Sequence, residues 1–447
     1  MTTALALRYA KPVPRYTSYP TAPHFHPGVD NATYRGWLGA LSDEATLSLY
    51  LHVPFCDRLC WFCGCHTKQT NRYDPVAEYL ETLGTEVAAV GSLVAGRVVS
   101  IHLGGGSPSM LRPDDFRTLA DRLRHAFTVD PAAEFSIEID PNDMDEARYD
   151  ALAEIGINRI SLGVQDFNPT VQAAINRPQS FEQTKAVVDA MRARGVGSVN
   201  LDVLYGLPHQ TVETVEATVE QALSLAPDRM AIFGYAHVPW MKTHQKMIDE
   251  AALPGIEARF EQSSAAAARI AARGYQAVGF DHFAKPCDSL AIAARAGRLH
   301  RNFQGYTTDD ATALVGLGAS AIGRLPQGYV QNQTPTAQYA REVALHGTAI
   351  ARGVAFTGED ELRGYVIERL MCDFALDTAD LTRRFGRLAD PVIGDIAAIA
   401  TDDADDLVDY RNGVLSLTAT GKPFVRTIAA RFDSYLNQGT ARHSVAV

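Results

Sequence analysis

Short apolar runs alternate with amphipathic segments through the first two-thirds of the chain. Six runs are rich in Val, Ile, Leu, Tyr or Phe, and each ends at a Gly, Pro, Asp or His; they lie at 48–53, 98–103, 134–139, 159–164, 198–204 and 230–235. Their apolar character is nearly continuous, which is typical of strands buried on both faces of a parallel sheet. We therefore predict six buried parallel strands.

Segments with helical spacing separate these runs. The first begins at Asp74-Pro75, which we interpret as an N-cap followed by proline at the first helical position. Apolar stripes at the same spacing lie at 80–90, 116–127, 187–195 and 212–223. Strand and helix in repeated alternation predict a parallel α/β sheet, either doubly wound or curved into a barrel.

Polar and glycine-rich residues follow every predicted strand. They include the stretch around Cys56, the run Gly104–Gly106, and later Glu138, Gln165, Asp202 and His237. Parallel strands bring these residues to one carboxyl edge, where barrel enzymes keep their active sites. With all six strand ends occupied in this way, the sequence favours an incomplete (β/α) TIM-like barrel of about six parallel strands.

The pattern changes near residue 356. Helical spacing at 359–372, 379–386 and 391–400 is followed by two short strands around Asn412-Gly413, a strong hairpin signal, and by a last amphipathic helix with Phe424, Ile428 and Phe432. This order predicts a small α+β, winged-helix-like module, and four aspartates within 402–406 argue against DNA binding. We predict an N-terminal lid at 1–44, a catalytic barrel with an extension at 45–355, and a covering domain at 356–447.

Composition and charge narrow the function. The 447 residues are 46% hydrophobic and 21% charged, which excludes a mainly disordered chain. A net charge of −11 argues against a general nucleic-acid binder, so an anionic ligand needs a local group of Arg or Lys. No run approaches a membrane span, and the opening apolar stretch is too short for a signal peptide. We expect a cytoplasmic globular protein that does not bind membranes.

Four of the six cysteines lie between residues 56 and 65. Zinc sites usually pair two cysteine knuckles a dozen or more residues apart, although a zinc-stabilised scaffold stays open as an alternative. A ferredoxin supplies four cysteines to each cubane cluster. If only Cys56, Cys60 and Cys63 bind a 4Fe–4S cluster, one iron stays open. Their C-x3-C-x2-C spacing is the signature of radical S-adenosylmethionine (SAM) enzymes, in which SAM binds that iron.

Over nearly its whole length the chain resembles the oxygen-independent coproporphyrinogen III oxidases of bacterial haem biosynthesis. The stretches that carry the resemblance are 14–21, 50–65, 281–284, 299–308, 366–372 and 432–436. Ser107 and Trp61 depart from the residues common in the family, which are Thr and Tyr. Some relatives lack the fourth cysteine and act as haem chaperones. Cys65 and the stretch 300–308 favour the oxidase, with a haem-binding chaperone as the alternative.

The resemblance implies a set of site residues. It makes Cys56, Cys60 and Cys63 the cluster ligands, and Cys65 and Glu138 the candidates for a catalytic role. The implied SAM-binding residues are Tyr50, Phe62, Gly105, Gly106, Ser107, Glu138, Gln165, Arg177, Asp202, Ala236 and Ile322, and those near a second SAM are Phe303 and Gln304. Read without the resemblance, Glu138 could equally be the ion-pair partner of a barrel arginine, and Cys65 could merely fill space.

The resemblance also implies the reaction. Two propionate side chains of coproporphyrinogen III would be decarboxylated oxidatively to vinyl groups by a 5′-deoxyadenosyl radical, giving protoporphyrinogen IX with two SAM consumed per product. A reductant protein such as flavodoxin or ferredoxin would supply electrons to a monomeric enzyme. Because the substrate carries four carboxylates, we expect basic side chains at the barrel mouth, with Arg15, Lys285 and Arg301 as candidates.

Overall fold

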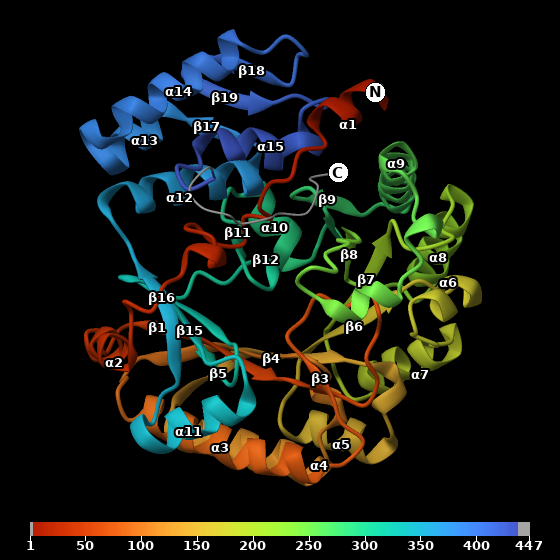
Figure 1. The fold of residues 1–447 in the computed structure, drawn as a ribbon, viewed down its shortest axis with the longest axis vertical. Helices are drawn as coiled ribbons and strands as arrows, with labels where there is room; N and C mark the ends of the chain where they lie inside the picture. Colours follow the sequence, from red (N-terminus) through yellow and green to blue (C-terminus); the bar gives the residue numbers. More distant parts are fainter. Residues whose placement is uncertain (1–2, 437–447) are drawn as a thin grey trace.

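The computed structural model describes residues 3–436 and is organised around one twelve-stranded sheet. Seven strands at its centre run parallel in the order β13-β1-β4-β5-β6-β7-β8. Their bounds are β1 (Thr46–Val53), β4 (Arg97–Gly105), β5 (Thr128–Ile139), β6 (Arg159–Gln165), β7 (Ser198–Tyr205), β8 (Arg229–Gly234) and β13 (Ala313–Leu317). All six predicted strands are confirmed, as is the incomplete α/β barrel that they form (Figure 1).

The seventh parallel strand, β13, was not predicted. It is only five residues long and pairs with β1, which precedes it by more than 250 residues in the chain. Antiparallel strands extend the sheet beyond both ends of the parallel part: β14 (Ile322–Leu325), β15 (Gly328–Asn332) and β16 (Ile350–Ala355) beside β13, and β10 (His282–Ala284) and β9 (Gln276–Val278) beside β8. Short strands without clear alternation give little signal in a sequence.

Helices cover the outer face of the parallel strands, as the strand–helix alternation predicted (Figure 1). They are α2 (Asn31–Gly39), α3 (Asp74–Gly91), α4 (Pro113–Ala126), α5 (Glu146–Glu154), α6 (Pro169–Ala174), α7 (Phe181–Ala193), α8 (Val212–Ser224), α9 (Ile256–Ala272), α10 (Ser289–Arg295) and α11 (Thr336–His346). The predicted N-cap was wrong by one position, because Tyr73 is the N-cap of α3 and Asp74 lies in its first turn. The apolar stripes of α3, α4, α7 and α8 pack into one core with the strands.

The C-terminal module is the α+β unit that the sequence predicted. It contains α12 (Gly358–Asp373), β17 (Ala375–Asp377), α13 (Thr378–Phe385), α14 (Asp390–Thr401), β18 (Val408–Arg411), β19 (Val414–Leu417) and α15 (Val425–Ala429). The strands form an antiparallel sheet in the order β17-β19-β18. The predicted last helix is shorter than expected, since only residues 425–429 are α-helical and 3₁₀ turns flank them on both sides. Residues 437–447 of the predicted covering domain lie outside the described residues.

The first part of the N-terminal segment, through Tyr19, packs on this module, whereas Val29, Tyr34 and Leu38 of the predicted lid belong to the barrel core. Helix α1 (Thr3–Tyr9) lies against the module in Figure 1, and Val13, Tyr16 and Tyr19 belong to its hydrophobic core. Arg8 forms an ion pair with Asp405 at 2.5 Å. Parts of the chain about 400 residues apart therefore form one unit above the barrel. Residues 1–2 of the predicted lid lie outside the described residues.

None of the helices between residues 3 and 436 has both the length and the apolar character that a membrane span requires.

A buried carboxyl group fixes the antiparallel extension to helix α3. Glu86 is 0% exposed and accepts hydrogen bonds from the Gly318 amide at 2.7 Å, the Asn332 side-chain amide at 2.7 Å and the Tyr339 hydroxyl at 2.6 Å. Burial raises the pKa of Glu86 to about 7, although each of these hydrogen bonds opposes the shift. The group therefore retains a proton in the folded chain at a pH where the unfolded chain has lost it.

This predicts a pH-dependent stability. As pH rises from about 5 to about 7.5, the free energy of unfolding falls by about 2 kcal/mol at this one site, because only the folded state then binds the extra proton. The variant Glu86→Gln removes this contribution. Glu86→Ala leaves three buried donors without an acceptor and costs about 3 kcal/mol. Urea unfolding at both pH values measures these effects, with the exposed Glu78→Gln on the same helix as control. Equal pH slopes in the wild type and Glu86→Gln would contradict the assignment.

Candidate functional site

The three predicted ligand cysteines lie on one loop that follows β1. Short strands β2 (Phe55–Cys56) and β3 (Lys68–Gln69) pair in parallel at the base of this loop. Cys56, Cys60 and Cys63 are half-buried, and Cys65 is exposed. Because β1 runs parallel to its neighbours β13 and β4, the loop that follows it emerges at the carboxyl edge of the parallel strands.

Two other segments hold the loop by its backbone. At the end of α6, the Ile175 carbonyl accepts a hydrogen bond from the Trp61 amide at 3.0 Å, and the Asn176 side chain donates to the Leu59 carbonyl at 3.0 Å. From the segment after β8, three side chains donate to loop carbonyls at 2.7–2.9 Å: His244 to Cys63, Lys242 to Cys65 and Gln245 to Phe62. The shape of the loop is therefore imposed by the ends of distant strands and helices.

The glycine run after β4 packs directly on the cysteine loop. A Cβ atom on Gly106 would lie 2.4 Å from the Phe55 carbonyl oxygen, and Gly105 has a φ of +117°, which side chains rarely adopt. The Gly106 amide donates to Val53 at 2.8 Å, and the Ser107 amide donates to Phe55 at 2.7 Å. The Ser107 hydroxyl is engaged by Asp143 and Ser109. Glycine is thus needed here because two backbones meet.

A cation lies beside the thiols of the loop, and the surroundings act on them differently. Arg177 lies 3.5 Å from the Cys60 sulfur and 3.0 Å from Asp140, so a cation stands beside the loop. Hydrogen bonding from Cys65 lowers the pKa of Cys63 to about 7, aided by Lys242 and Arg177. Burial raises the pKa of Cys56 to about 12, with Thr67 opposing it. Metal binding favours the thiolate at all three positions.

This donor set fits an iron–sulfur cluster. Between residues 3 and 436, no three His, Cys, Asp or Glu side chains converge on a point where one metal ion could bind. A 4Fe–4S cluster instead bonds each thiolate to a different iron, so its donors are spread around a volume. The buried Nε of Arg177 has no hydrogen-bond partner among the described atoms and lies beside this loop. Three cysteines on one loop would leave one iron for another ligand.

Glu138 faces an open space inside the barrel. Its side chain is 43% exposed, although its neighbours Ile137 and Ile139 are buried. It accepts a hydrogen bond from the Gly105 amide at 3.0 Å and lies 3.4 Å from His102. Burial favours the protonated form of Glu138, but His102 and the Gly105 amide together hold its pKa below the usual value. The group is therefore a carboxylate beside the glycine run, and no arginine pairs with it among the described residues.

Tyr50, also predicted, adjoins this carboxylate. Its hydroxyl lies 2.9 Å from Nδ1 of His52, and its ring stacks on His102 with centroids 5.8 Å apart. Burial lowers the pKa of His52 to about 4, so its ring is neutral and donates from Nε2 to the His66 carbonyl. These rings form one wall of the barrel interior next to the cysteine loop.

The remaining predicted residues of the first SAM site lie along the same strand ends. Asp202 on β7 accepts from Asn200 at 2.8 Å and from Ser161 at 3.3 Å, and burial raises its pKa. Gln165 ends β6 with a φ of +62°, a strained backbone of the kind that clusters at functional sites. Phe62 packs with Trp61 beside the ends of β7 and β8, and the Ala236 carbonyl accepts from Gln245 at 3.2 Å. The structure thus brings these residues to one edge.

The predicted residues of the second SAM site lie apart from this edge. Phe303 and Gln304 form the turn between β11 (His300–Asn302) and β12 (Gly305–Thr307). Phe303 packs with Tyr329 and with Ile322 in a small apolar cluster. Ile322 packs with Phe303 and begins β14 just after the carboxyl end of β13, the strand next to the one that carries Tyr50. Phe303 also lines a cavity of about 490 Å³.

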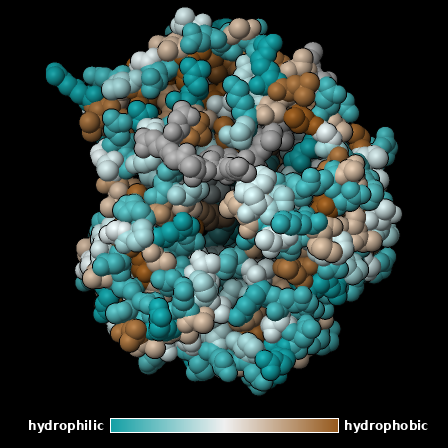
Figure 2. Space-filling view, in the orientation of Figure 1, coloured by the Kyte–Doolittle hydropathy of each residue, from teal (hydrophilic) through white to brown (hydrophobic). Residues whose placement is uncertain are grey.

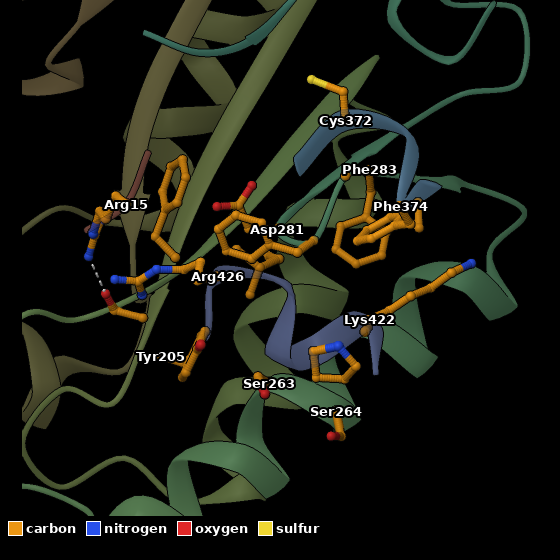
Figure 3. A pocket seen from close by; sticks show the side chains of 18 of the residues that line it. Arg15, Tyr205, Ser263, Ser264, Asp281, Phe283, Cys372, Phe374, Lys422 and Arg426 are labelled. Carbon is orange, nitrogen blue, oxygen red and sulfur yellow. Dashed lines mark hydrogen bonds between the residues drawn. The ribbon is translucent and has the colours of Figure 1, made fainter. Parts of the chain in front are cut away.

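A larger cavity, of about 850 Å³, opens beyond the ends of β7 and β8 (Figure 3). Arg15, Arg259 and Arg426 line it, from the N-terminal segment, α9 and the C-terminal module. Arg15 donates to the Gly234 carbonyl at 3.0 Å, and Arg259 donates to the Tyr235 carbonyl at 2.8 Å. Figure 2 shows a hollow in the middle of the face below the C-terminal module, where barrel and module meet.

The cavity is rich in positive charge. Burial lowers the pKa of Arg15, Arg259 and Arg426, and the Arg15 and Arg426 cations further disfavour each other. Arginine nevertheless stays charged in proteins. Two carboxylates, Asp281 and Asp373, also line the cavity, and Asp281 is hydrogen-bonded to His282 at 2.6 Å. Arg301, a predicted substrate contact, lies over the rings of Phe280 and Tyr306 next to this cavity. The cavity therefore favours an anionic ligand.

Lys285 was a wrong candidate for substrate contact. Its ammonium donates to Asp228 at 2.8 Å, and Asp228 lies just before β8, at the amino edge of the sheet. Lys285 is therefore an ion-pair partner on the side of the barrel opposite the cysteine loop.

Several residues of the site were not predicted from the sequence. His52, His102 and Asn200 occupy alternate positions with predicted polar residues in buried strands, so their side chains point to the same face. Two polar residues two positions apart inside an apolar run could have predicted that both side chains face the site. Lys242, His244, Arg259 and Arg426 lie in segments without any motif, and only the folded chain brings them to the site.

Comparison with known proteins confirms the resemblance. A profile of the Radical SAM superfamily matches residues 50–222. The chain is 47% identical to the oxygen-independent coproporphyrinogen III oxidase of Bradyrhizobium diazoefficiens, over 99% of both chains. It is 40% identical to that of Escherichia coli K12, over 97% of this chain and 95% of the relative.

A solved structure agrees with the sequence comparison. The coproporphyrinogen III oxidase HemN from Escherichia coli, a radical SAM enzyme, superposes with a TM-score of 0.91 at 39% identity, over 97% of this chain and 99% of that chain. Similarity of this extent spans the barrel, the cysteine loop and the C-terminal module together. The chain therefore belongs to the family of oxygen-independent coproporphyrinogen III oxidases, within the Radical SAM superfamily.

Proposed function

We propose that this protein converts coproporphyrinogen III to protoporphyrinogen IX without oxygen, by oxidative decarboxylation of two propionate side chains to vinyl groups in haem biosynthesis. One observation carries the proposal: the three-cysteine loop shares its sheet edge with a cavity of about 850 Å³ that is lined by arginines from three parts of the chain. The family to which the chain belongs supports the same reaction.

The loop holds the cofactors. Cys56, Cys60 and Cys63 would bind a 4Fe–4S cluster, and SAM would occupy the fourth iron between the glycine run and Glu138. When bound, this pair supplies a one-electron cleavage that yields a carbon radical able to abstract hydrogen. Tyr50, Phe62, Gln165, Arg177, Asp202, Ala236 and Ile322 would complete the SAM environment, and Phe303 and Gln304 would contact a second SAM.

The arginines orient the substrate. Bidentate hydrogen bonds from guanidinium groups hold carboxylates in a fixed direction. Arg15, Arg259 and Arg426 reach the cavity from three parts of the chain, so a bound tetracarboxylate would also fasten these parts to one another. The N-terminal segment and the C-terminal module would then act as the lid that keeps water and other hydrogen donors from the reacting carbon.

The stoichiometry follows from the chemistry of one propionate. Each loses one hydrogen atom from its β-carbon to the radical, then CO₂ and one electron, which an external one-electron acceptor takes up; two propionates therefore consume two SAM molecules. We propose that a small reductant protein such as flavodoxin or ferredoxin supplies the electrons, and that the chain acts as a monomer.

Anaerobic turnover tests the function directly. Protein reconstituted with iron and sulfide is incubated with coproporphyrinogen III, SAM and dithionite. We expect protoporphyrinogen IX, CO₂ and methionine to form in step, with two methionines for each porphyrinogen. A protein that binds haem but forms none of these products would contradict the proposal and favour the chaperone.

Cys65 offers a test of the loop. It is exposed at the end of the loop and lies outside the three-cysteine set, so we propose that it acts on the substrate rather than on iron. We expect Cys65→Ser to keep its iron content and to lower the rate of vinyl formation by about tenfold or more. Cys60→Ser should lose both iron and activity, and the exposed Cys287→Ser should lose neither. Unchanged turnover in Cys65→Ser would make Cys65 a packing residue.

Arg259 offers a test of the cavity. Arg259→Met retains most of the side-chain volume and removes the charge. Loss of a charge-assisted hydrogen bond to a carboxylate costs about 1.5–3 kcal/mol, so we expect KM for coproporphyrinogen III to rise by about tenfold or more. Iron content and SAM binding should not change. Arg273→Met, just beyond the same helix and paired with Glu220, serves as control. A variant with normal KM would exclude Arg259 from substrate binding.

A further inference from the structure

The segment that covers the cysteine loop exposes a group of large apolar side chains. Trp240, Met241 and Met247 are 49%, 64% and 59% exposed. The other side chains of this segment point the opposite way, since Lys242, His244 and Gln245 all donate to carbonyls of the cysteine loop. We call Trp240, Met241, Lys246 and Met247 the loop-cover patch. Clustered apolar exposure of this kind marks an interaction site.

Formal charge around the loop-cover patch is balanced, whereas the whole chain is acidic. Arg58 on the cysteine loop, together with Lys242 and Lys246, has no ion pair with a carboxylate among residues 3–436. The acidic side chains on the same two segments are Asp57, Asp249 and Glu250, and Glu250 is paired with His237 at 3.0 Å. On a protein of net charge −11, this is a region where an acidic partner meets no net repulsion and where Arg58, Lys242 and Lys246 can pair with its carboxylates.

We propose that the loop-cover patch is the docking site of a small, acidic, one-electron carrier protein. The inference rests on the proposed function, which requires an electron from outside for each cleavage of SAM. The carrier gives up one electron and is oxidised, and the group held by Cys56, Cys60 and Cys63 takes up that electron. No bond between the two proteins is formed or broken.

The position and composition of the patch fit this partner. Electron transfer weakens steeply with distance. The segment that carries the patch contacts the cysteine loop directly, because His244 and Lys242 donate to the carbonyls of Cys63 and Cys65 at 2.7 Å and 2.9 Å. Aromatic and methionine side chains are enriched in the centres of protein interfaces. Interfaces between redox proteins are small and transient, so a few exposed apolar side chains beside unpaired cations are sufficient.

Stopped-flow reduction with two electron donors tests the proposal. Fully reduced flavodoxin is mixed with anaerobic holoenzyme, and bleaching of the cluster absorbance gives the rate; dithionite serves as the small donor. The variants are Met241→Asp and Lys246→Glu, with Leu345→Asp as control because Leu345 is 68% exposed on α11. Titration calorimetry measures the affinity of each protein for flavodoxin separately from turnover.

We expect both patch variants to be reduced by flavodoxin about tenfold more slowly than the wild type and to bind it correspondingly more weakly. Their reduction by dithionite, and the behaviour of Leu345→Asp with both donors, should match the wild type. Wild-type rates and affinities in both patch variants would overturn the proposal. So would a wild-type dimer that Met241→Asp converts to a monomer, since the patch would then bind a second copy. Absence of porphyrinogen product with dithionite would instead refute the proposed function.

Discussion

The cysteine loop has little structure of its own, and the rest of the site depends on how its backbone is held. Its carbonyl groups accept hydrogen bonds from the glycine run after β4, from the end of α6 and from the segment after β8. Each donor reaches the loop only because the parallel strands end at one edge. Three thiols at a fixed spacing, with a cation beside them, are the outcome of that arrangement. The glycines serve the same end, since any side chain on Gly106 would push the loop away.

Much of this could be predicted from the sequence, for identifiable physical reasons. The six buried strands could be predicted because burial on both faces requires long apolar runs. The cysteine loop could be predicted because its spacing is a local sequence motif. Strand β13 was not predicted because a run of five residues has too little hydrophobic periodicity and its partner β1 is far away in the chain. Lys285 was wrongly predicted as a substrate contact because the sequence around it does not show at which edge of the sheet its side chain lies. Arg259 and Arg426 carry no motif at all, because their role comes from where folding puts them.

The net charge of the chain does not predict the charge of the side chains that line its cavity. The chain carries an excess of acidic residues, yet the cavity of about 850 Å³ beyond the ends of β7 and β8 gathers arginines from three distant segments. Holding these cations together without a ligand is unfavourable, as their lowered pKa values show. The hydrophobic packing of the N-terminal segment on the C-terminal module offsets that cost and keeps the cavity preformed. A bound tetracarboxylate would relieve the repulsion, so binding and closure favour each other.

The shared core of the N-terminal segment and the C-terminal module also sets an order of events during synthesis. Val13, Tyr16 and Tyr19 leave the ribosome early, whereas the side chains that bury them, such as Leu370 and Phe432, are among the last to appear. The barrel strands emerge in between and can fold first, since domains fold as units while the chain grows. The cavity lined by Arg15, Arg259 and Arg426 is therefore completed only after the last residues of the module have been made, whereas the segment that covers the cysteine loop belongs to the barrel and can fold with it.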